Sequence, residues 1–296
     1  MNANVRGAYH SELYKDALLW KDGPVTLCIA AACQYRNQPR IITCTDWKVS
    51  SAWGSAENTD KLRWIKSPNW VALTAGGATS ADALVRACRQ ALKDQNLTEE
   101  NALDQFTRIA QTRLTKIKDA YVMKLLGVSY EYLRLNWKKE FPESVALDVY
   151  RGIGQIDLGA SLIVAGFVPI RTTMKPLICR IDKSCNVSIS DHFECIGSGS
   201  VVARPTLLRR SYNSDLSLMD AIYRLYEAKN LSEVIETVGQ DTSLDVLFPT
   251  GELEQLSEKG HDRMGVLLRK FGPKAKIKKP PLEQKYFDSL DFLRLH

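Results

Sequence analysis

The sequence has few histidines. Four histidines occur in 296 residues, and none is spaced with a cysteine or glutamate as zinc ligands are. The seven cysteines are an odd number and form no CxxC pair. They therefore predict buried, unpaired thiols and not a disulfide framework or a metal centre. We expect no metal and no cofactor.

Long apolar runs are also missing. No uninterrupted apolar stretch approaches the roughly 20 residues that a membrane-spanning helix needs. The first residues show no apolar core followed by a small-residue cleavage site, so we expect no secretory signal and a cytoplasmic protein. Hydrophobic residues make up 45% of the chain and charged residues 25%, the balance of an ordinary globular protein. A chain of this length can bury a large core.

Positive charge is unevenly placed along the chain. The net charge is +6, and lysines gather in residues 270–281 among proline and glycine, with no apolar period. This composition favours a solvated tail, and the alternative is an arm that binds anions or nucleic acid. No interleaving of aromatic residues supports base stacking there, so nucleic acid is not expected as a partner.

Four apolar runs in the first quarter of the chain predict two β-hairpins that lead into a helix. The first run opens with Thr26, and the second ends on Asp46. Lys61 precedes the third run, and the fourth ends in Gly76 and Gly77 at the start of the helix. Consecutive strands thus deliver a hydroxyl, a carboxylate, an amine and a glycine-flanked backbone, and we expect them at one end of the sheets.

This order resembles the proteasome β-type subunits of the N-terminal-nucleophile hydrolases, including their shorter bacterial relatives. In that family a strand opening with threonine precedes a strand ending in aspartate, a lysine stands before the next strand, and an Ala-Gly-Gly turn enters the first long helix. The similarity resumes in the segments SLIVAGF, CIGSGS and SLMDAIYRLYEA, so it covers roughly residues 25–247. The resemblance implies an α+β fold, a four-layer αββα sandwich.

The expected organisation has three parts. They are residues 1–24, an N-terminal extension or propeptide; residues 25–248, the proteasome-like domain; and residues 249–296, a C-terminal extension with the basic tail. Apolar spacing predicts helices over residues 78–95 and about 99–118. Residues 119–155 then predict an inserted helical hairpin that is broken near Phe141 and Pro142. Such a tyrosine- and tryptophan-rich patch is more often a packing or subunit-contact surface than a ligand site.

The resemblance also implies a chemistry for five residues. Thr26 would be the nucleophile, with its own freed α-amine as the base that accepts the hydroxyl proton. Lys61 would supply a fixed positive charge beside the hydroxyl, and Asp46 would hold Lys61. The backbone N–H of Gly76 would face the oxyanion, and Ser198 would contact the α-amine.

Two classes of function remain open at this point. One is a threonine-type peptidase or amidohydrolase that acts on peptides or unfolded proteins within a homo-oligomeric ring or stack of rings. The other is a catalytically inactive, proteasome-like subunit with a structural or interaction role. It is favoured by Val25, which stands before Thr26 where the family has a glycine, because a β-branched residue crowds the carbonyl that must be attacked. Asp241 and Ser243 lie near the family's aspartate and serine before the closing strand, without a fixed register.

Overall fold

The computed structural model shows a mixed α+β protein. It describes residues 26–51, 54–57, 61–66, 69–272 and 292–295. These residues form seven helices, two large antiparallel sheets and one small hairpin, which confirms the α+β class. The expected N-terminal extension, residues 1–24, lies outside the described residues, and so do residues 273–281 of the basic stretch.

The first sheet is built on the hairpin of β1 (Cys28–Tyr35) and β2 (Gln38–Asp46). The hairpin turns at Arg36 and Asn37, which have φ angles of 50° and 59°. A two-residue turn with both φ values positive matches the twist of the strands it joins. The sheet has the order β10-β1-β2-β11-β12-β13. Its other strands are β10 (Phe193–Ile196), β11 (Thr242–Leu247), β12 (Leu253–Leu256) and β13 (Phe292–Leu295).

The second sheet is a meander in chain order, β5-β6-β7-β8-β9. Its strands are β5 (Leu62–Lys66), β6 (Trp70–Gly76), β7 (Ala160–Ile170), β8 (Thr173–Ile181) and β9 (Val187–Ser190). Between the two sheets in sequence, β3 (Lys48–Ser51) and β4 (Gly54–Glu57) form a separate hairpin.

The sheets pack face to face, and helices cover their outer faces. The helices are α2 (Ala78–Leu92) and α3 (Glu99–Leu126) on the second sheet, with α6 (Ser200–Arg209), α7 (Leu218–Ser232) and α8 (Glu258–Phe271) on the first. Strand β1 is almost wholly apolar because both of its faces are buried. Ile29 belongs to the core beneath α6 and α7, whereas Cys28 and Ala30 belong to the core between the sheets. A strand buried on both faces cannot alternate with polar residues.

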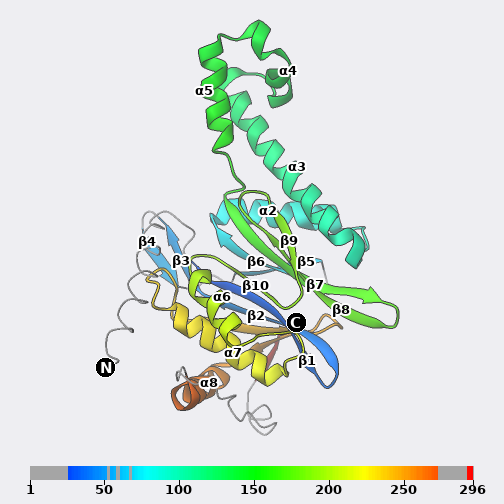
Figure 1. The fold of residues 1–296 in the computed structure, drawn as a ribbon, viewed down its shortest axis with the longest axis vertical. Helices are drawn as coiled ribbons and strands as arrows, with labels where there is room; N and C mark the ends of the chain where they lie inside the picture. Colours follow the sequence, from blue (N-terminus) through cyan, green and yellow to red (C-terminus); the bar gives the residue numbers. More distant parts are fainter. Residues whose placement is uncertain (1–25, 52–53, 58–60, 67–68, 273–291, 296) are drawn as a thin grey trace, which may run out of the picture.

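The second helix extends into an arm that projects from the body (Figure 1). The expected end near Lys118 is wrong, because α3 continues to Leu126 and stops only at Gly127, which has a φ of 71°. No glycine or proline interrupts the segment before that point, and Val122 is buried.

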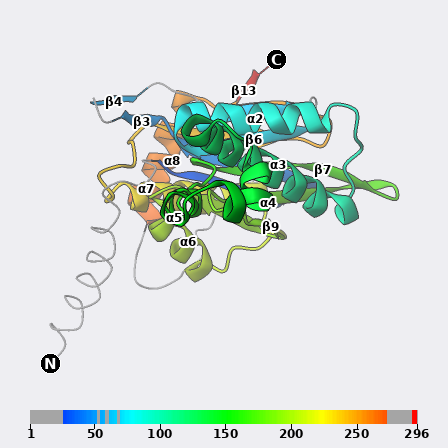
Figure 2. The ribbon, with the colours of Figure 1, turned by 90° about the horizontal axis from the view of Figure 1, so that it is seen from above.

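Two shorter helices complete the arm. These are α4 (Tyr130–Glu140) and α5 (Glu143–Gly154), which separate at Phe141 and Pro142 as expected. They pack on α3 through a small cluster of Val122, Leu133, Val149 and Ile153. Viewed from above, α4 and α5 lie in front of the strands (Figure 2).

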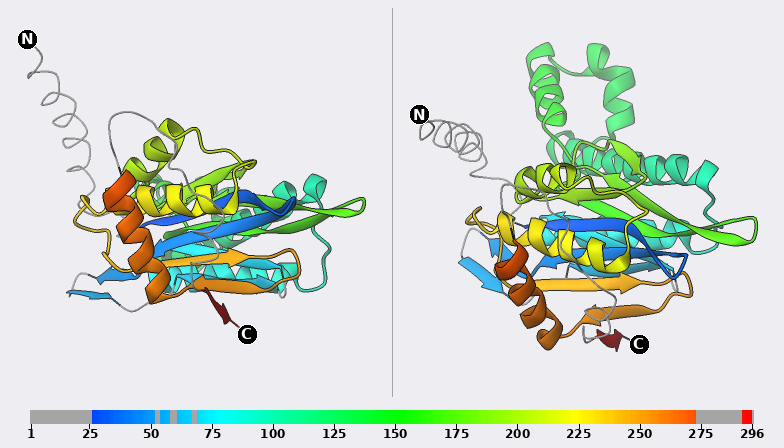
Figure 3. Two further views of the ribbon diagram at one scale, coloured as in Figure 1. Left: turned by 90° about the horizontal axis from the view of Figure 1, so that it is seen from below. Right: turned by 60° about the horizontal axis from the view of Figure 1, so that its bottom comes forward.

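The chain after residue 248 belongs to the same body as the first sheet. Leu256 of β12 and Met264 and Leu267 of α8 join the core cluster formed with α6 and α7, and α8 lies beside α7 (Figure 3). The boundary expected at residue 248 is therefore no structural break. Among the described residues, no helix combines the length and the apolar content needed to cross a membrane.

Candidate active site

Thr26, Asp46 and Lys61 meet in the interior of the protein. Thr26 Oγ1 lies 2.6 Å from Asp46 Oδ1, and Lys61 Nζ lies 2.5 Å from the same carboxylate oxygen. Lys61 Nζ also donates a hydrogen bond to Thr26 Oγ1. The three residues are only 2%, 0% and 4% exposed. Charge on Lys61 is therefore compensated by Asp46 and not by water.

Strand order explains how the three residues come together. Asp46 ends β2, and its backbone N–H bonds Leu27 O beside Thr26. Lys61 directly precedes β5 of the second sheet, and its carbonyl accepts a bond from the Thr74 N–H of β6. Because the Cys28 thiol of β1 lies 3.3 Å from Thr74 O, the two sheets face each other at this end. Lys61 thus reaches Thr26 across the gap between the sheets.

The carboxylate of Asp46 accepts four hydrogen bonds. Its Oδ1 takes the Thr26 hydroxyl, the Leu27 N–H at 2.7 Å and Lys61, and its Oδ2 takes the Gly239 N–H at 2.9 Å. A fully buried carboxylate is stable only with such partners. They also fix the direction of the bonds at Thr26, because an ammonium can only donate. The Thr26 hydroxyl donates to Asp46 and accepts from Lys61, and of these two groups it is the ammonium of Lys61 that lowers the cost of an alkoxide at this oxygen.

Ser198 lies beside the nitrogen of Thr26. The Thr26 N–H donates to Ser198 Oγ at 3.3 Å, and Ser198 Oγ lies 2.7 Å from Thr237 Oγ1. The Gly199 N–H donates to Thr26 O at 3.2 Å. The turn after β10 therefore holds both main-chain polar groups of Thr26.

Gly76 ends β6 at the same end of the molecule, two residues after Thr74. Its φ is 122°, and a Cβ there would lie 2.7 Å from the Cα of Ala160 on β7. The backbone conformation alone thus requires glycine. No hydrogen bond among the described residues joins Gly76 to Thr26, so its expected place at an oxyanion rests on the resemblance.

Three residues of the site escape sequence reasoning: Thr237, Gly239 and Lys229. Thr237 and Gly239 sit in an irregular segment whose path no local pattern indicates. Lys229 is only 1% exposed. Its Nζ donates to the Glu233 side chain at 2.7 Å and to the Gln240 carbonyl, so it contacts both ends of the irregular segment. A signal for Lys229 exists, because it follows Leu225 at four-residue spacing on the inward face of α7.

The two candidates before the closing strand lie apart from this cluster. Asp241 is exposed. Ser243 is buried, but it donates to Asp245 and accepts from Gln255. The register places Thr242, and not Ser243, opposite Asp46.

Comparison with known proteins does not assign this chain to a family. A scan against protein-family models finds no match, and a search of the curated proteins also finds none. Within the part of the chain that the structure describes, no group of three or more histidine, cysteine or acidic residues could hold a metal ion. What the site can do therefore follows from its own groups: a hydroxyl between an ammonium and a carboxylate, with a main-chain nitrogen and a serine hydroxyl beside it.

Gly197→Ala is expected to displace Thr26. Gly197 has a φ of 91°, and a Cβ there would lie 2.2 Å from Thr26 O. We expect a loss of about 2–4 kcal/mol in the free energy of unfolding, from the unfavourable φ together with the overlap. Gly127→Ala is the matched control, because Gly127 has a φ of 71° but nothing within 4 Å of the added Cβ. It should lose only about 1 kcal/mol. Urea unfolding would measure both, and equal losses would show that no overlap with Thr26 exists.

Proposed function

We propose that this chain is a threonine-type peptidase or amidohydrolase of the proteasome-like, N-terminal-nucleophile class, with Thr26 as its nucleophile. One observation carries the proposal: Lys61 Nζ contacts both Thr26 Oγ1 and Asp46 Oδ1 in a buried site. A buried ion pair is weak support for stability alone. Its contact with a hydroxyl is what nucleophilic catalysis by threonine needs.

The proposed reaction begins with hydrolysis of the Val25–Thr26 bond, which consumes one water, leaves a carboxylate on Val25 and frees the α-amine of Thr26. That amine, with an ordinary pKa of about 7.7–8.0, takes the proton of the Thr26 hydroxyl. Oγ1 attacks the carbonyl carbon of a peptide bond and forms a tetrahedral oxyanion. The oxyanion collapses as the protonated amine gives its proton to the leaving amine, and an ester remains on Thr26. Water, deprotonated by the same amine, then hydrolyses the ester and restores the hydroxyl.

The other residues of the site would assist these reaction steps by their charge and their position. The ammonium of Lys61 would stabilise negative charge on Oγ1 and disfavour protonation of the nearby α-amine. Asp46 would hold both Lys61 and Thr26. Ser198 would orient the α-amine, since its hydroxyl already bonds the Thr26 nitrogen. Gly76 would offer its N–H to the oxyanion.

The arrangement of the layers supports the same class. Two antiparallel sheets pack face to face with helices on both outer faces, as expected for an αββα sandwich. The projecting part of α3, with α4 and α5, corresponds to the expected helical insertion.

An inactive, structural subunit is the second candidate, favoured by the bond before Thr26. An amide nitrogen has no basic lone pair, so Thr26 joined to Val25 cannot supply the base. In that case Asp46 and Lys61 would only be a structural ion pair.

We further propose a homo-oligomer, a ring or stack of rings, in the cytoplasm. The arm leaves apolar side chains in solvent: Met123 is 48% exposed, Leu125 50%, Leu135 68% and Leu147 44%. Such a concentration of apolar surface is typical of subunit contacts. Seven free thiols, six of them buried, are consistent with a reducing compartment. Peptides or unfolded proteins would be the substrates.

The state of the Thr26 nitrogen in the assembled protein tests the proposal. Light scattering would first identify species larger than the 33.3 kDa monomer. Intact-mass measurement of those species would then show whether residues 1–25 have been removed. We expect removal in the wild type and in Thr26→Ser, which keeps a hydroxyl, but not in Thr26→Ala. If every chain of the functional assembly keeps Met1, the inactive subunit is the correct interpretation. A monomer at every concentration would contradict the proposed assembly.

A further inference from the structure

A groove between α2 and α3 carries positive charge that the proposed active site does not use. It has a volume of about 600 Å³, within the range of about 300–1,000 Å³ typical of ligand sites. The cations that line it are Arg86, Arg108, Arg113 and Lys116, and no aspartate or glutamate lines it. A ligand in this groove would therefore meet charge of one sign only.

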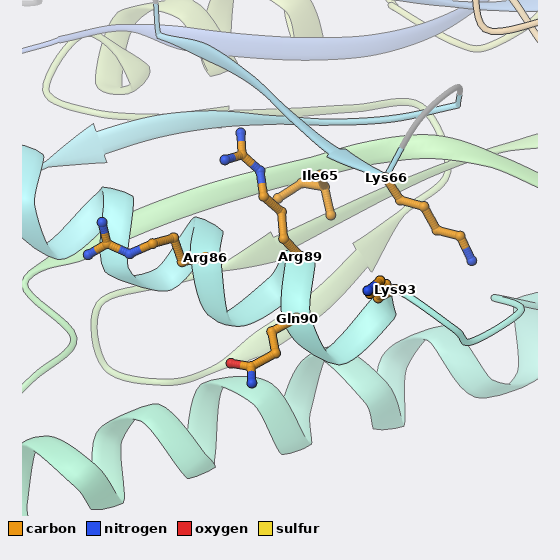
Figure 4. A pocket seen from close by; sticks show the side chains of 6 residues that line it. All are labelled: Ile65, Lys66, Arg86, Arg89, Gln90 and Lys93. Atoms are coloured by element: carbon orange, nitrogen blue, oxygen red, sulfur yellow. The ribbon is translucent and has the colours of Figure 1, made fainter.

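A second hollow, on the other side of α2, continues the positive charge. It is lined by Lys66 of β5 and by Arg86, Arg89 and Lys93 of α2, again without an acidic residue. Figure 4 shows these side chains spread along α2 with Lys66 facing the end of the helix. Arg86 is common to both hollows, so the two form one continuous basic surface.

The cations of the groove lack anionic partners. Among the described residues, no ion pair involves Arg86, Arg108, Arg113 or Lys116. Lys175, by comparison, is paired with a glutamate of α3. Like charges that gather without counter-charges repel one another, and an anionic ligand would relieve this repulsion.

The spacing of the polar groups suits an extended ligand. Arg108, Thr112 and Lys116 stand four residues apart on α3, so they form a row with one group per turn. Arg86 and Gln90 form a similar row on the facing side of α2. Two rows that follow a groove can bind anionic groups repeated along a chain.

The rest of the lining decides between kinds of anion. Ala83, Ala87 and Ala91 stand four residues apart, and with Ile109 they give the groove a narrow apolar floor. Three glutamines, Gln90, Gln95 and Gln105, also line it, and a glutamine amide can both donate and accept hydrogen bonds. A peptide offers matching groups: carboxylates for the cations, main-chain N–H and C=O for the amides, and methylenes for the floor. No aromatic residue lines the groove, so bases of a nucleic acid would find nothing to stack on.

We propose that the α2–α3 groove binds an acidic segment of a partner protein. The proposal stands on the charge and shape of these two helices, and it is independent of any hydrolase activity at Thr26.

Fluorescence anisotropy with a labelled, glutamate-rich peptide would test the proposal on the full chain. We expect binding at about 50 mM KCl that weakens strongly at about 300 mM, because exposed charges are screened. Arg86→Glu combined with Arg108→Glu should weaken binding at least about tenfold, since two exposed charges are reversed. The matched control is Arg134→Glu combined with Lys139→Glu, which changes the charge equally on exposed residues of α4 and should leave binding unchanged. Far-UV circular dichroism would confirm that both variants are folded.

Competition would identify the ligand class. A glutamine-rich peptide of equal length should not displace the probe. No binding at low salt, equal weakening by the two double variants, or tighter binding of inorganic polyphosphate or oligouridylate through Arg86 and Arg108 would each overturn the proposal.

Discussion

Lys61→Met is expected to lower kcat/KM for hydrolysis of a peptide amide by at least about 10³-fold. Lys61 is the cation that the structure places on Thr26 Oγ1, and removing a group that stabilises charge in the transition state costs about 10²–10³ in rate even when the rest of the site is intact. Residues that act as a unit lose most of their rate with any one member. The charge acts on the transition state and does not bind the substrate, so kcat and kcat/KM should fall together.

The measurement has to separate hydrolysis from processing, since the proposed function uses Thr26 for both. Each variant would therefore be produced with Thr26 freed by an added protease site, and fluorogenic peptide amides would be the substrates. Lys175→Met is the matched control, because Lys175 also forms an ion pair, with Glu99, but on the surface. It should keep full activity. A folded Lys61→Met protein within tenfold of the wild type would show that Lys61 is not part of the reaction.

Asp46→Asn is expected to lower the free energy of unfolding by about 3–5 kcal/mol, because it leaves the buried charge of Lys61 without its partner. Asp46 is 0% exposed and Lys61 only 4%, so solvent cannot replace the lost carboxylate. Adding Lys61→Met to Asp46→Asn should restore part of this stability, since no unpaired charge then remains. Neither protein should hydrolyse peptides.

Urea unfolding of the wild type, the two single variants and the double variant forms the test. A coupling energy above about 1 kcal/mol between the two sites is expected for residues in direct contact. Strictly additive losses of unfolding free energy would mean that Asp46 and Lys61 do not compensate each other's charge. The proposed role of their ion pair at Thr26 would then be wrong.

Local sequence patterns predicted the elements that carry the site. The runs before and after Arg36 and Asn37 become β1 and β2, because each has apolar side chains on both faces and a turn between them. The position of Thr26 at the start of one apolar run and Asp46 at the end of the next indicated their proximity, which their 2.6 Å contact shows, although β1 itself begins only at Cys28. The catalytic role of these residues stays a proposal.

Local sequence patterns do not predict features that depend on contacts between residues far apart in the chain. Strands β3 and β4 are short and rich in serine and glycine, so they lack the apolar pattern that predicts strands. The bond from Gly239 to Asp46 joins residues 193 positions apart and depends on the path of an irregular segment. The last turns of α3 pack on α4 and α5, and this contact between separate helices has no local sequence signal.

The place of β13 at the border of the first sheet has a consequence for engineering the protein. β13 pairs with β12 along Leu253–Leu256 and so occupies hydrogen-bonding groups that would otherwise face solvent. Deleting residues 292–295 would move the free edge of the sheet from β13 to β12, and a newly exposed edge strand is a template for pairing with another molecule. We therefore expect shortened versions of the chain to pair or aggregate through β12, and tags or fusions are better placed where they do not disturb β13.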